Sequence, residues 1–361
     1  MALRLLHFAD LHLDRSFARE RLSGPAASRC RQDLRQALTR IVERAATAGC
    51  DLITCGGDLF DQETVTRETA DFVAELLGKA GLPVLLVPGH SDPPDAGSVY
   101  RWADWPNNVR VVLHEELRPY AYGGVTVWAA GFLGPSPPAS ALSHFRPTAG
   151  RNLLLLHASD MSRLPEATAP WAPIVPSQLQ EAGFAHALLG HYHVACTSSA
   201  LTYPGSPEPL GWNDTGPHCV ALVTVSEEGP AAVSLERFNR REFARETLDI
   251  TGMSQSDIKA ALLNVRASKH LDQAIVRMVL TGQRARRAGL DLEILTAECA
   301  DAFAHLELID RSRHPHDLDA LSREFTTRGE TIRRLQGRRA DGEPDAVVAR
   351  AVEMVADAFD E

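Results

Sequence analysis

The feature that most constrains this chain is a series of short apolar runs, each followed at once by aspartate or histidine. The runs have the length of buried strands and occupy residues 2–9, 51–55, 83–87, 152–156 and 186–189. A helical stripe of apolar residues separates the first two: Leu34, Leu38, Ile41, Val42 and Ala45. Residues 65–80 form a second predicted helix. This alternation predicts an α/β fold with a parallel sheet.

The pattern changes further along the chain. Strand-like runs at residues 125–132, 218–225 and 231–238 have no helix between them, which predicts a second, more antiparallel sheet packed on the first. After about residue 240 the alternation of strands and helices indicates a separate α+β domain. We therefore expect one domain at 1–240 and a second, smaller domain at 241–361. The terminal helix carries an apolar stripe that packs within the chain or docks a partner helix: Val348, Val352, Val355 and Phe359.

Charge and cysteine content limit the functions open to this chain. The formal net charge is −10, so any contact with nucleic acid must rest on local basic patches. One candidate patch contains Arg284, Arg286 and Arg287 and another contains Arg333 and Arg334, although a solvated surface explains either patch alone. The six cysteines form no C-x-x-C pair, which is typical of reduced thiols in a cytoplasmic protein. We expect neither a signal peptide nor a membrane span.

The side chains that can carry chemistry follow the predicted strands: Asp10, His12, Asp58, His90, Asp92, His157, His191 and His193. Because ligands bind at the carboxyl ends of strands in open α/β sheets, we expect these side chains to converge on one site. Carboxylates and imidazoles without thiolates suit Mn²⁺, Fe²⁺ or Zn²⁺. Any one of them alone would be interpreted as a helix cap or a hydrogen-bonded histidine. Their succession along the chain favours a metal site.

The motifs occur in the order FADLHLD, GGDLFD, PGHSD, LLHASD, GHYH and TYPGSPEPLGWNDTGPH. In order and approximate spacing the chain resembles the calcineurin-like metallophosphoesterases, and more narrowly the SbcD/YhaO-type DNA-repair exonucleases. The last motif, at residues 202–218, is the one more specific to the DNA-repair branch. The resemblance implies a four-layer α/β/β/α sandwich, with the nuclease site in residues 1–240, and a small C-terminal α+β cap domain in residues 241–361 that binds DNA or a partner.

The resemblance also implies two divalent metal ions, Mn²⁺ in the first place. One would be held by Asp10, His12, Asp58 and His193, and the other by Asp58, His157, His191 and the residue at position 90. Such a pair activates a water and clamps the attacking and leaving oxygens of a phosphodiester. Asp61 would orient a ligand or a loop amide, or it would cap a helix.

The turn PGHSD contains three catalytic candidates, His90, Ser91 and Asp92, and departs from the family pattern. The family has Gly-Asn-His-Asp here, in which asparagine binds metal and histidine protonates or stabilises the leaving oxygen. His90 can replace asparagine as a ligand. The hydroxyl of Ser91 cannot replace the acid, whose loss typically slows a reaction about 10²- to 10⁴-fold. Alternatively, the loop shifts so that His90 becomes the acid and a ligand is lost.

Three functions remain open on this basis. The first is an Mn²⁺-dependent DNA exonuclease or endonuclease of the SbcD type, slowed by Ser91, that acts with an SbcC-like coiled-coil ATPase and can form a homodimer. The second is a metal-binding subunit of weak or no activity that positions DNA ends or the ATPase. The third is a phosphodiesterase acting on small substrates, which the predicted cap domain and the Tyr-Pro-Gly-Ser segment disfavour.

Overall fold

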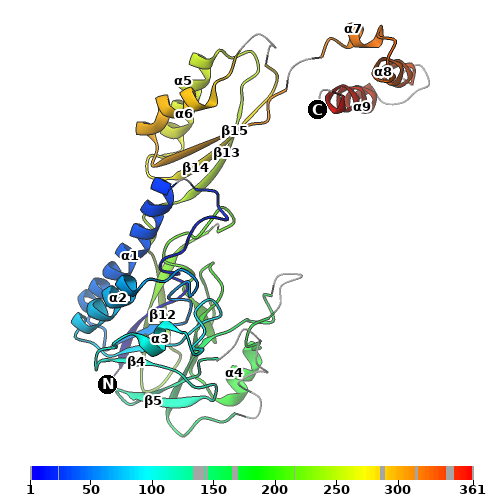
Figure 1. Cartoon of the computed structure of the whole chain (residues 1–361). Coiled ribbons are helices and arrows are strands. Elements are labelled where there is room, and N and C mark those ends of the chain that lie inside the picture. Colours follow the sequence, from blue (N-terminus) through cyan, green and yellow to red (C-terminus); the bar gives the residue numbers. More distant parts are fainter. Residues whose placement is uncertain are drawn as a thin grey trace. The chain divides into compact units, whose positions relative to one another are not determined.

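Figure 1 shows a computed structural model of the chain, which describes residues 2–22, 24–132, 142, 145–164, 170–214, 216–284, 289–313, 316–338 and 345–359. Contacts divide the chain into two compact units. The larger unit comprises Met1–Ala244 and Gln273–Ile275, and the smaller comprises Arg245–Asp272 and Val276–Glu361. The assignment of a nuclease role to residues 1–240 and a binding role to 241–361 stays a prediction.

The first sheet of the larger unit has six strands in the order β12-β11-β1-β2-β3-β4. The parallel strands are β1 (Leu3–Phe8), β2 (Leu52–Cys55), β3 (Val84–Leu86) and β4 (Val109–Val111). On the other side of β1 lie β11 (Cys219–Val225) and β12 (Ala232–Arg237), both antiparallel to their neighbours. The connections contain α1 (Gly24–Thr47), α2 (Arg67–Lys79) and the short α3 (Val99–Trp102). The first two agree with the helices that the apolar spacing predicts.

The second sheet has six strands in the order β5-β6-β7-β8-β10-β9. They are β5 (Arg118–Tyr122), β6 (Val125–Ala129), β7 (Arg151–His157), β8 (His186–Gly190), β10 (Leu201–Tyr203) and β9 (Cys196–Thr197), with α4 (Pro176–Ala182) between β7 and β8. Four of these strands, β6, β7, β8 and β10, run parallel. A second sheet is therefore present as expected, but the expectation that it is more antiparallel than the first is wrong. The hairpin of β11 and β12 pairs instead with β1, whose other edge is taken by β2.

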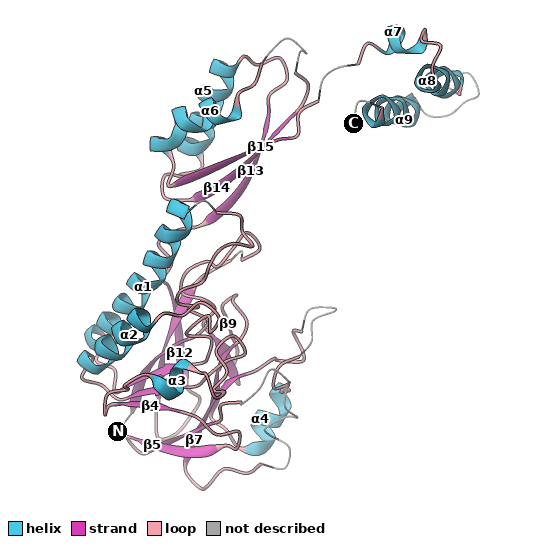
Figure 2. Ribbon diagram, in the orientation of Figure 1, coloured by secondary structure: helices cyan, strands magenta, loops and turns pink. Residues whose placement is uncertain are grey.

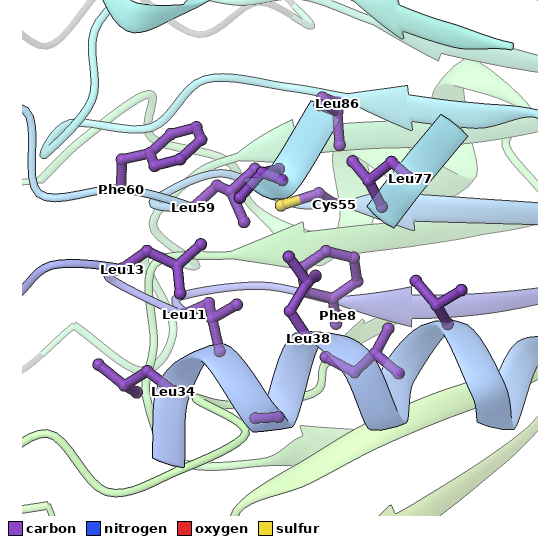
Figure 3. Packing of buried hydrophobic residues seen from close by; sticks show 14 of the residues in the cluster. Phe8, Leu11, Leu13, Leu34, Leu38, Cys55, Leu59, Phe60, Leu77 and Leu86 are labelled. Atoms are coloured by element: carbon purple, nitrogen blue, oxygen red, sulfur yellow. The ribbon is translucent and has the colours of Figure 1, made fainter. Parts of the chain in front are cut away.

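The two sheets pack face to face, with helices on their outer faces (Figure 2). The space between the sheets is filled by fully buried aliphatic residues from both: Leu5, Leu85, Val127, Leu155 and Leu188. On the outer face of the first sheet, Leu38 of α1 lies in the same cluster as Phe8 of β1 (Figure 3). On the outer face of the second sheet, Leu179 of α4 clusters with Leu156 of β7. The layers form the α/β/β/α sandwich that the resemblance implies.

Two glycines let the sheets approach each other where their strands end. A Cβ on Gly190, the last residue of β8, would lie 2.2 Å from the carbonyl oxygen of Gly56 and 2.8 Å from the Cβ of Ala9. A Cβ on Gly56 would lie 2.8 Å from the amide nitrogen of Gly190. The closest contacts involve backbone atoms, which cannot turn aside as a flexible side chain can. These glycines therefore set the spacing of the loops after β1, β2 and β8.

The smaller unit is built mainly on a three-stranded sheet in the order β13-β14-β15. Its elements are β13 (Phe243–Asp249), α5 (Gln255–Ser268), β14 (Ile275–Thr281), α6 (Leu292–Cys299), β15 (His305–Asp310), α7 (Leu318–Ser322), α8 (Thr327–Gly337) and α9 (Asp345–Ala358). Val348 and Val352 of α9 are buried in one cluster with Ile332 of α8, so this part of the apolar stripe packs within the chain. Phe359 is 51% exposed. In the described ranges, no helix is long and apolar enough to cross a membrane.

We expect Gly190→Ala to lower the free energy of unfolding by about 1–3 kcal/mol, the usual cost of overpacking. The reason is the collision of the added methyl group with the backbone of Gly56. Urea denaturation would measure the change. The matched control is Gly337→Ala in α8, where no atom of the described residues lies within 4 Å of an added Cβ and stability should stay equal or rise. Equal stability of Gly190→Ala and the wild type would contradict the inferred close approach.

Candidate metal centre

Loops at one edge of the two sheets bring acidic and histidine side chains together. Asp10 and His12 follow β1, Asp58 follows β2, His157 ends β7 and His191 follows β8. Of these residues, Asp10, His12, Asp58 and His191 have positive φ angles, of 54°, 49°, 51° and 107°. Positive φ is unfavourable for residues with a side chain, and such strain concentrates at functional sites. The local backbone is thus held in an unfavourable conformation where the side chains converge.

The carboxylate of Asp58 lies at the centre of the cluster and is fully buried. Its Oδ2 is 3.0 Å from Nδ1 of His90 and 3.4 Å from Nε2 of His12, and its Oδ1 is 3.6 Å from Nε2 of His157. Ser91 donates its amide hydrogen to Oδ1 at 2.8 Å and its hydroxyl hydrogen to Oδ2 at 2.9 Å. Burial alone would raise the pKa of Asp58, but the surrounding histidines hold it well below its usual value. Asp58 is therefore a buried carboxylate at neutral pH.

Hydrogen bonds on the outer side of two rings decide which nitrogen faces the cluster. Nδ1 of His12 lies 2.6 Å from Oδ1 of Asp61, and Nδ1 of His157 lies 2.9 Å from the carbonyl oxygen of Gly56. Carboxylate and carbonyl oxygens accept, so Nδ1 of each ring donates and Nε2 keeps its lone pair. This arrangement orients metal-binding histidines in general. The N-cap of α2 is Thr66, so Asp61 contacts a candidate ligand and does not cap that helix.

A third histidine is held in the same way by a residue that the sequence analysis missed. Nδ1 of His193 lies 3.3 Å from Oδ1 of Asp214. The other oxygen of Asp214 accepts a hydrogen bond from the amide of Leu210 at 3.0 Å. Burial alone would lower the pKa of His193, but its bond to Asp214 and the charge of Asp10 raise it to about 9. The one feature of the sequence that could have indicated this role of Asp214 is its position within the 202–218 motif.

The side chains form three groups whose ligand atoms lie within 4.8 Å of one another: Asp10, His12 and His193; Asp10, Asp58 and His157; and His90, His157 and His191. Two buried ring nitrogens of the cluster, Nε2 of His12 and Nδ1 of His191, have no hydrogen-bond partner among the described residues. Buried polar atoms normally find partners, and an unpaired one is costly. A divalent ion would satisfy both nitrogens. The donors, imidazole nitrogen and carboxylate oxygen, fit a pair of such ions.

Burial favours neutral forms for several of these side chains. It lowers the pKa of His191 to about 3 and lowers that of His157. A neutral imidazole is the form that binds metal. Burial also raises the pKa of Asp10, whose two oxygens accept the amide hydrogen of His191 at 3.0 and 3.1 Å. A bound cation would stabilise the charged form of this carboxylate.

The turn after β3 places His90 among the candidate ligands. Nδ1 of His90 lies 2.9 Å from Nε2 of His157, and its ring centroid is 5.1 Å from that of His191. The ring remains 39% exposed, so it borders the cluster on its open side. Ser91 turns its hydroxyl toward Asp58. His90 therefore lies among the candidate ligands, and its role as a ligand in place of the asparagine stays a prediction.

Asp92, the last candidate in the turn, points away from the cluster and into the core. It is fully buried and accepts hydrogen bonds from the amides of Gly89 and Phe60, at 2.6 and 3.0 Å. The hydroxyl of Tyr100 donates a third, at 2.7 Å. These contacts fix the shape of the turn. Asp92 therefore supports the site through the backbone and does not face it.

The candidate DNA-binding arginines lie in the smaller unit and make local contacts. Arg284 pairs with Asp310 at 3.2 Å. Arg333 and Arg334 both pair with Glu330 at 2.8 Å. The remaining two candidates, Arg286 and Arg287, lie outside the described residues. DNA binding by any of these arginines stays a prediction.

We expect Asp214→Asn to weaken Mn²⁺ binding at one site by about tenfold or more at pH 8.5, because His193 loses the carboxylate that orients it. Wild-type affinity should rise with pH up to about 9, because metal must displace the proton that Asp214 stabilises on His193. This rise should be weaker in the variant. Calorimetric titration at several pH values would measure both effects.

The matched control for Asp214→Asn is Asp160→Asn. Asp160 is also a buried carboxylate, but its Oδ1 accepts hydrogen bonds from Ser162. We expect metal affinity and its pH dependence to stay at wild-type values in this control. Equal behaviour of the two variants would contradict the positioning role of Asp214.

Comparison with known proteins places the chain in a family. The family model for calcineurin-like phosphoesterases, whose members use two divalent metal ions, matches residues 3–195, more than half of the chain. The DNA double-strand break repair protein Mre11 of Haloferax volcanii is 26% identical over 328 residues, which cover 88% of this chain and 68% of that protein. The protein of the same name from Saccharolobus solfataricus is 23% identical over 326 residues, which cover 81% and 78%. The resemblance found in the motifs is confirmed, and the chain belongs to the calcineurin-like phosphoesterase family.

Proposed function

We propose that this chain is a DNA nuclease of the SbcD type that depends on two divalent ions, Mn²⁺ in the first place. The observation that carries the proposal is the convergence of the candidate ligands: Asp10, His12, Asp58, His90, His157, His191 and His193. Two relatives named as DNA double-strand break repair proteins support DNA as the substrate. The reaction would be hydrolysis of a phosphodiester bond.

The chain's own residues would prepare the site before substrate arrives. When bound, the two ions would lower the pKa of a water and offset the charge of the phosphodiester. Asp58 would help to hold both ions, because its carboxylate is near His12 and also near His90 and His157. Asp61 and Asp214 hold the rings of two ligands through hydrogen bonds. Fixed ligands of this kind favour catalysis because little rearrangement is needed at the moment of reaction.

Protonation of the leaving oxygen is the step for which the turn at residues 88–92 supplies no well-placed general acid. The hydroxyl of Ser91 donates its hydrogen to Asp58 at 2.9 Å. His90 lies 3.0 Å from Asp58 and 2.9 Å from His157, which supports a ligand role over an acid role. The leaving oxygen would then take its proton from water, and we expect slow cleavage.

The same contact of Ser91 with Asp58 favours a second candidate function. In that alternative the chain binds metal with weak or no catalysis and positions DNA ends or a partner ATPase. A third alternative, a phosphodiesterase acting on small substrates, would use the same ions. The substrates cleaved decide between these alternatives.

We propose an SbcC-like coiled-coil ATPase as the protein partner, a homodimer as an assembly of the chain, and the cytoplasm as its location. Exposed apolar side chains support a docking surface for a partner helix. Val347 and Met354 on α9 are each 58% exposed, and Phe325 just before α8 is fully exposed. These side chains lie outside the cluster that holds α8 and α9 together.

We expect the purified chain to bind two Mn²⁺ ions and to cleave linear DNA, and we expect Asp58→Ala to lose both ions and all cleavage. The reason is that the carboxylate of Asp58 lies within 3.0 to 3.6 Å of His90, His12 and His157, which belong to different groups of candidate ligands. Metal analysis and assays on linear duplex and single-stranded DNA would test this. Full metal occupancy in Asp58→Ala would contradict the bridging role. Metal binding without cleavage of any DNA would favour the scaffold function, and cleavage of small diesters alone would favour the third alternative.

We expect Ser91→His to raise DNA cleavage by tenfold or more, because an imidazole beside the leaving oxygen supplies a proton, an effect typically worth about 10²- to 10⁴-fold. The single change keeps His90 beside His157 and His191. The double change His90→Asn with Ser91→His restores the family turn and should give the full gain, of which the single change recovers part.

The dependence on the leaving group makes this test sharper. A phosphodiester with a p-nitrophenolate leaving group needs little protonation, so its rate should rise much less in Ser91→His than the rate for DNA. Equal gains on both substrates would argue for a change in metal binding. No gain on DNA, with both ions bound, would contradict the account of Ser91.

A further inference from the structure

A cavity of about 410 Å³ lies beside the candidate metal centre, within the larger unit. Its walls come from residues of three loops, 15–20, 61–64 and 90–93. The size is within the range of small-ligand sites, about 300–1,000 Å³. The third of these loops is the turn that follows β3 and contains His90 and Ser91.

The cavity shares three wall residues with the metal centre. Asp61 holds the ring of His12, while His90 and Ser91 both contact the carboxylate of Asp58. A phosphodiester bound at the cluster therefore has its adjoining part within reach of the cavity. In a DNA strand that adjoining part is the next nucleotide, which carries its own phosphate.

Most charged groups in the cavity wall already have partners. Arg15 donates to Glu20 at 3.1 Å and to the carbonyl oxygen of Leu210 at 3.1 Å, and Asp61 is bound to His12. Arg19 is exposed. Among the described residues it has neither an ion pair nor a hydrogen bond for its guanidinium group, and the same holds for the carboxylate of Glu63. Arg19 is thus the cation of this wall that can bind an anion without breaking a contact.

The loop that carries Arg19 is fixed on both sides of it. Phe17 is 1% exposed and has a φ of 56°, and Arg21 also has a φ of 56°. Between them, the carbonyl oxygen of Glu20 accepts a hydrogen bond from Nε1 of Trp212 at 2.9 Å. A strained backbone held in place by buried anchors is typical of loops that are arranged for binding. Arg19 therefore projects from a fixed backbone.

We propose that Arg19 binds the phosphate next to the scissile phosphate of a DNA strand and so selects polynucleotides over single-phosphate diesters. The guanidinium group suits a phosphate because its donors match two oxygens at once. The exposed Glu63 on the same wall repels anions, which leaves Arg19 to hold the neighbouring phosphate. This role deepens the proposed nuclease function and rests on it. Arg19 acts as a positioning residue and not as a participant in bond cleavage.

The first test measures binding without catalysis. A fluorescent single-stranded oligothymidylate is titrated with the full chain in EDTA, at several salt concentrations. We expect Arg19→Ala to weaken binding by about tenfold and to lower the salt dependence by about one phosphate contact. Arg19→Lys should restore part of the loss, because it keeps the charge but not the paired donors. Glu63→Gln should strengthen binding.

Arg21→Ala is the matched control, because it removes the same charge from the same loop at a residue outside the cavity wall. We expect it to bind oligothymidylate as the wild type does, apart from the small effect of net charge. Equal weakening in Arg19→Ala and Arg21→Ala would overturn the proposal and leave only a general charge effect.

The second test separates this inference from the nuclease function. With Mn²⁺ present, Arg19→Ala should raise KM for the oligonucleotide at least tenfold more than KM for bis(p-nitrophenyl) phosphate, which has a single phosphate. Equal changes in KM for both substrates would overturn the role of Arg19 while leaving the nuclease function intact. If no DNA is cleaved by the wild type, the nuclease proposal fails, and the binding test still decides whether Arg19 holds a phosphate.

Discussion

The buried carboxylate of Asp58 is the point on which the candidate site depends, because every loop of the cluster meets it or its partners. A charged carboxylate without partners would be too costly to bury. Here the turn after β3 supplies both donors of Ser91, and the loops from both sheets supply imidazoles within 3.0 to 3.6 Å. Gly89 is part of the same arrangement, since a Cβ there would lie 2.1 Å from Oδ1 of Asp58. Folding of the strand ends and assembly of the metal ligands are therefore coupled.

The sequence predicted the members of this cluster better than it predicted the sheets. The residues after parallel strands had to meet at one edge, so Asp10, Asp58 and His157 could be placed together without knowing which sheet each strand joins. The strand composition of each sheet depends on which strand edge a hairpin pairs with. No local sequence pattern in β11 or β12 specifies β1 as that partner. For that reason the expectation of a more antiparallel second sheet was wrong, whereas the four-layer fold followed from the resemblance of the motifs to a known family.

Asp214 shows why the outer contacts of the ligands were harder to find. Its bond to His193 requires the segment after β10 to return to the metal centre, and that return is set by tertiary contacts and not by spacing along the chain. Asp61 was accessible to sequence reasoning because it follows Asp58 by three residues in the same loop. Asp61 and Asp214 hold their histidines by the same chemistry, a hydrogen bond from the ring to a carboxylate. They differ in how predictable their position was, because Asp61 lies in the loop of Asp58 and Asp214 comes from a separate segment.

The charge of the chain gives the metal ions a second role under the proposed function. With a net charge of −10, the protein as a whole repels a DNA strand. The described arginines of the predicted basic patches are held by Asp310 and Glu330, so they would have to give up or share an ion pair to contact phosphate. At the cluster, the carboxylates of Asp10 and Asp58, together with Asp61 and Asp214 behind two of the histidines, match the charge of two divalent ions, and the buried imidazoles of His157 and His191 are neutral. Bound ions would therefore offset the negative charge that these carboxylates place at the site. On an acidic protein, a DNA strand would then be repelled less at the place of cleavage when the metal ions are bound than when they are absent.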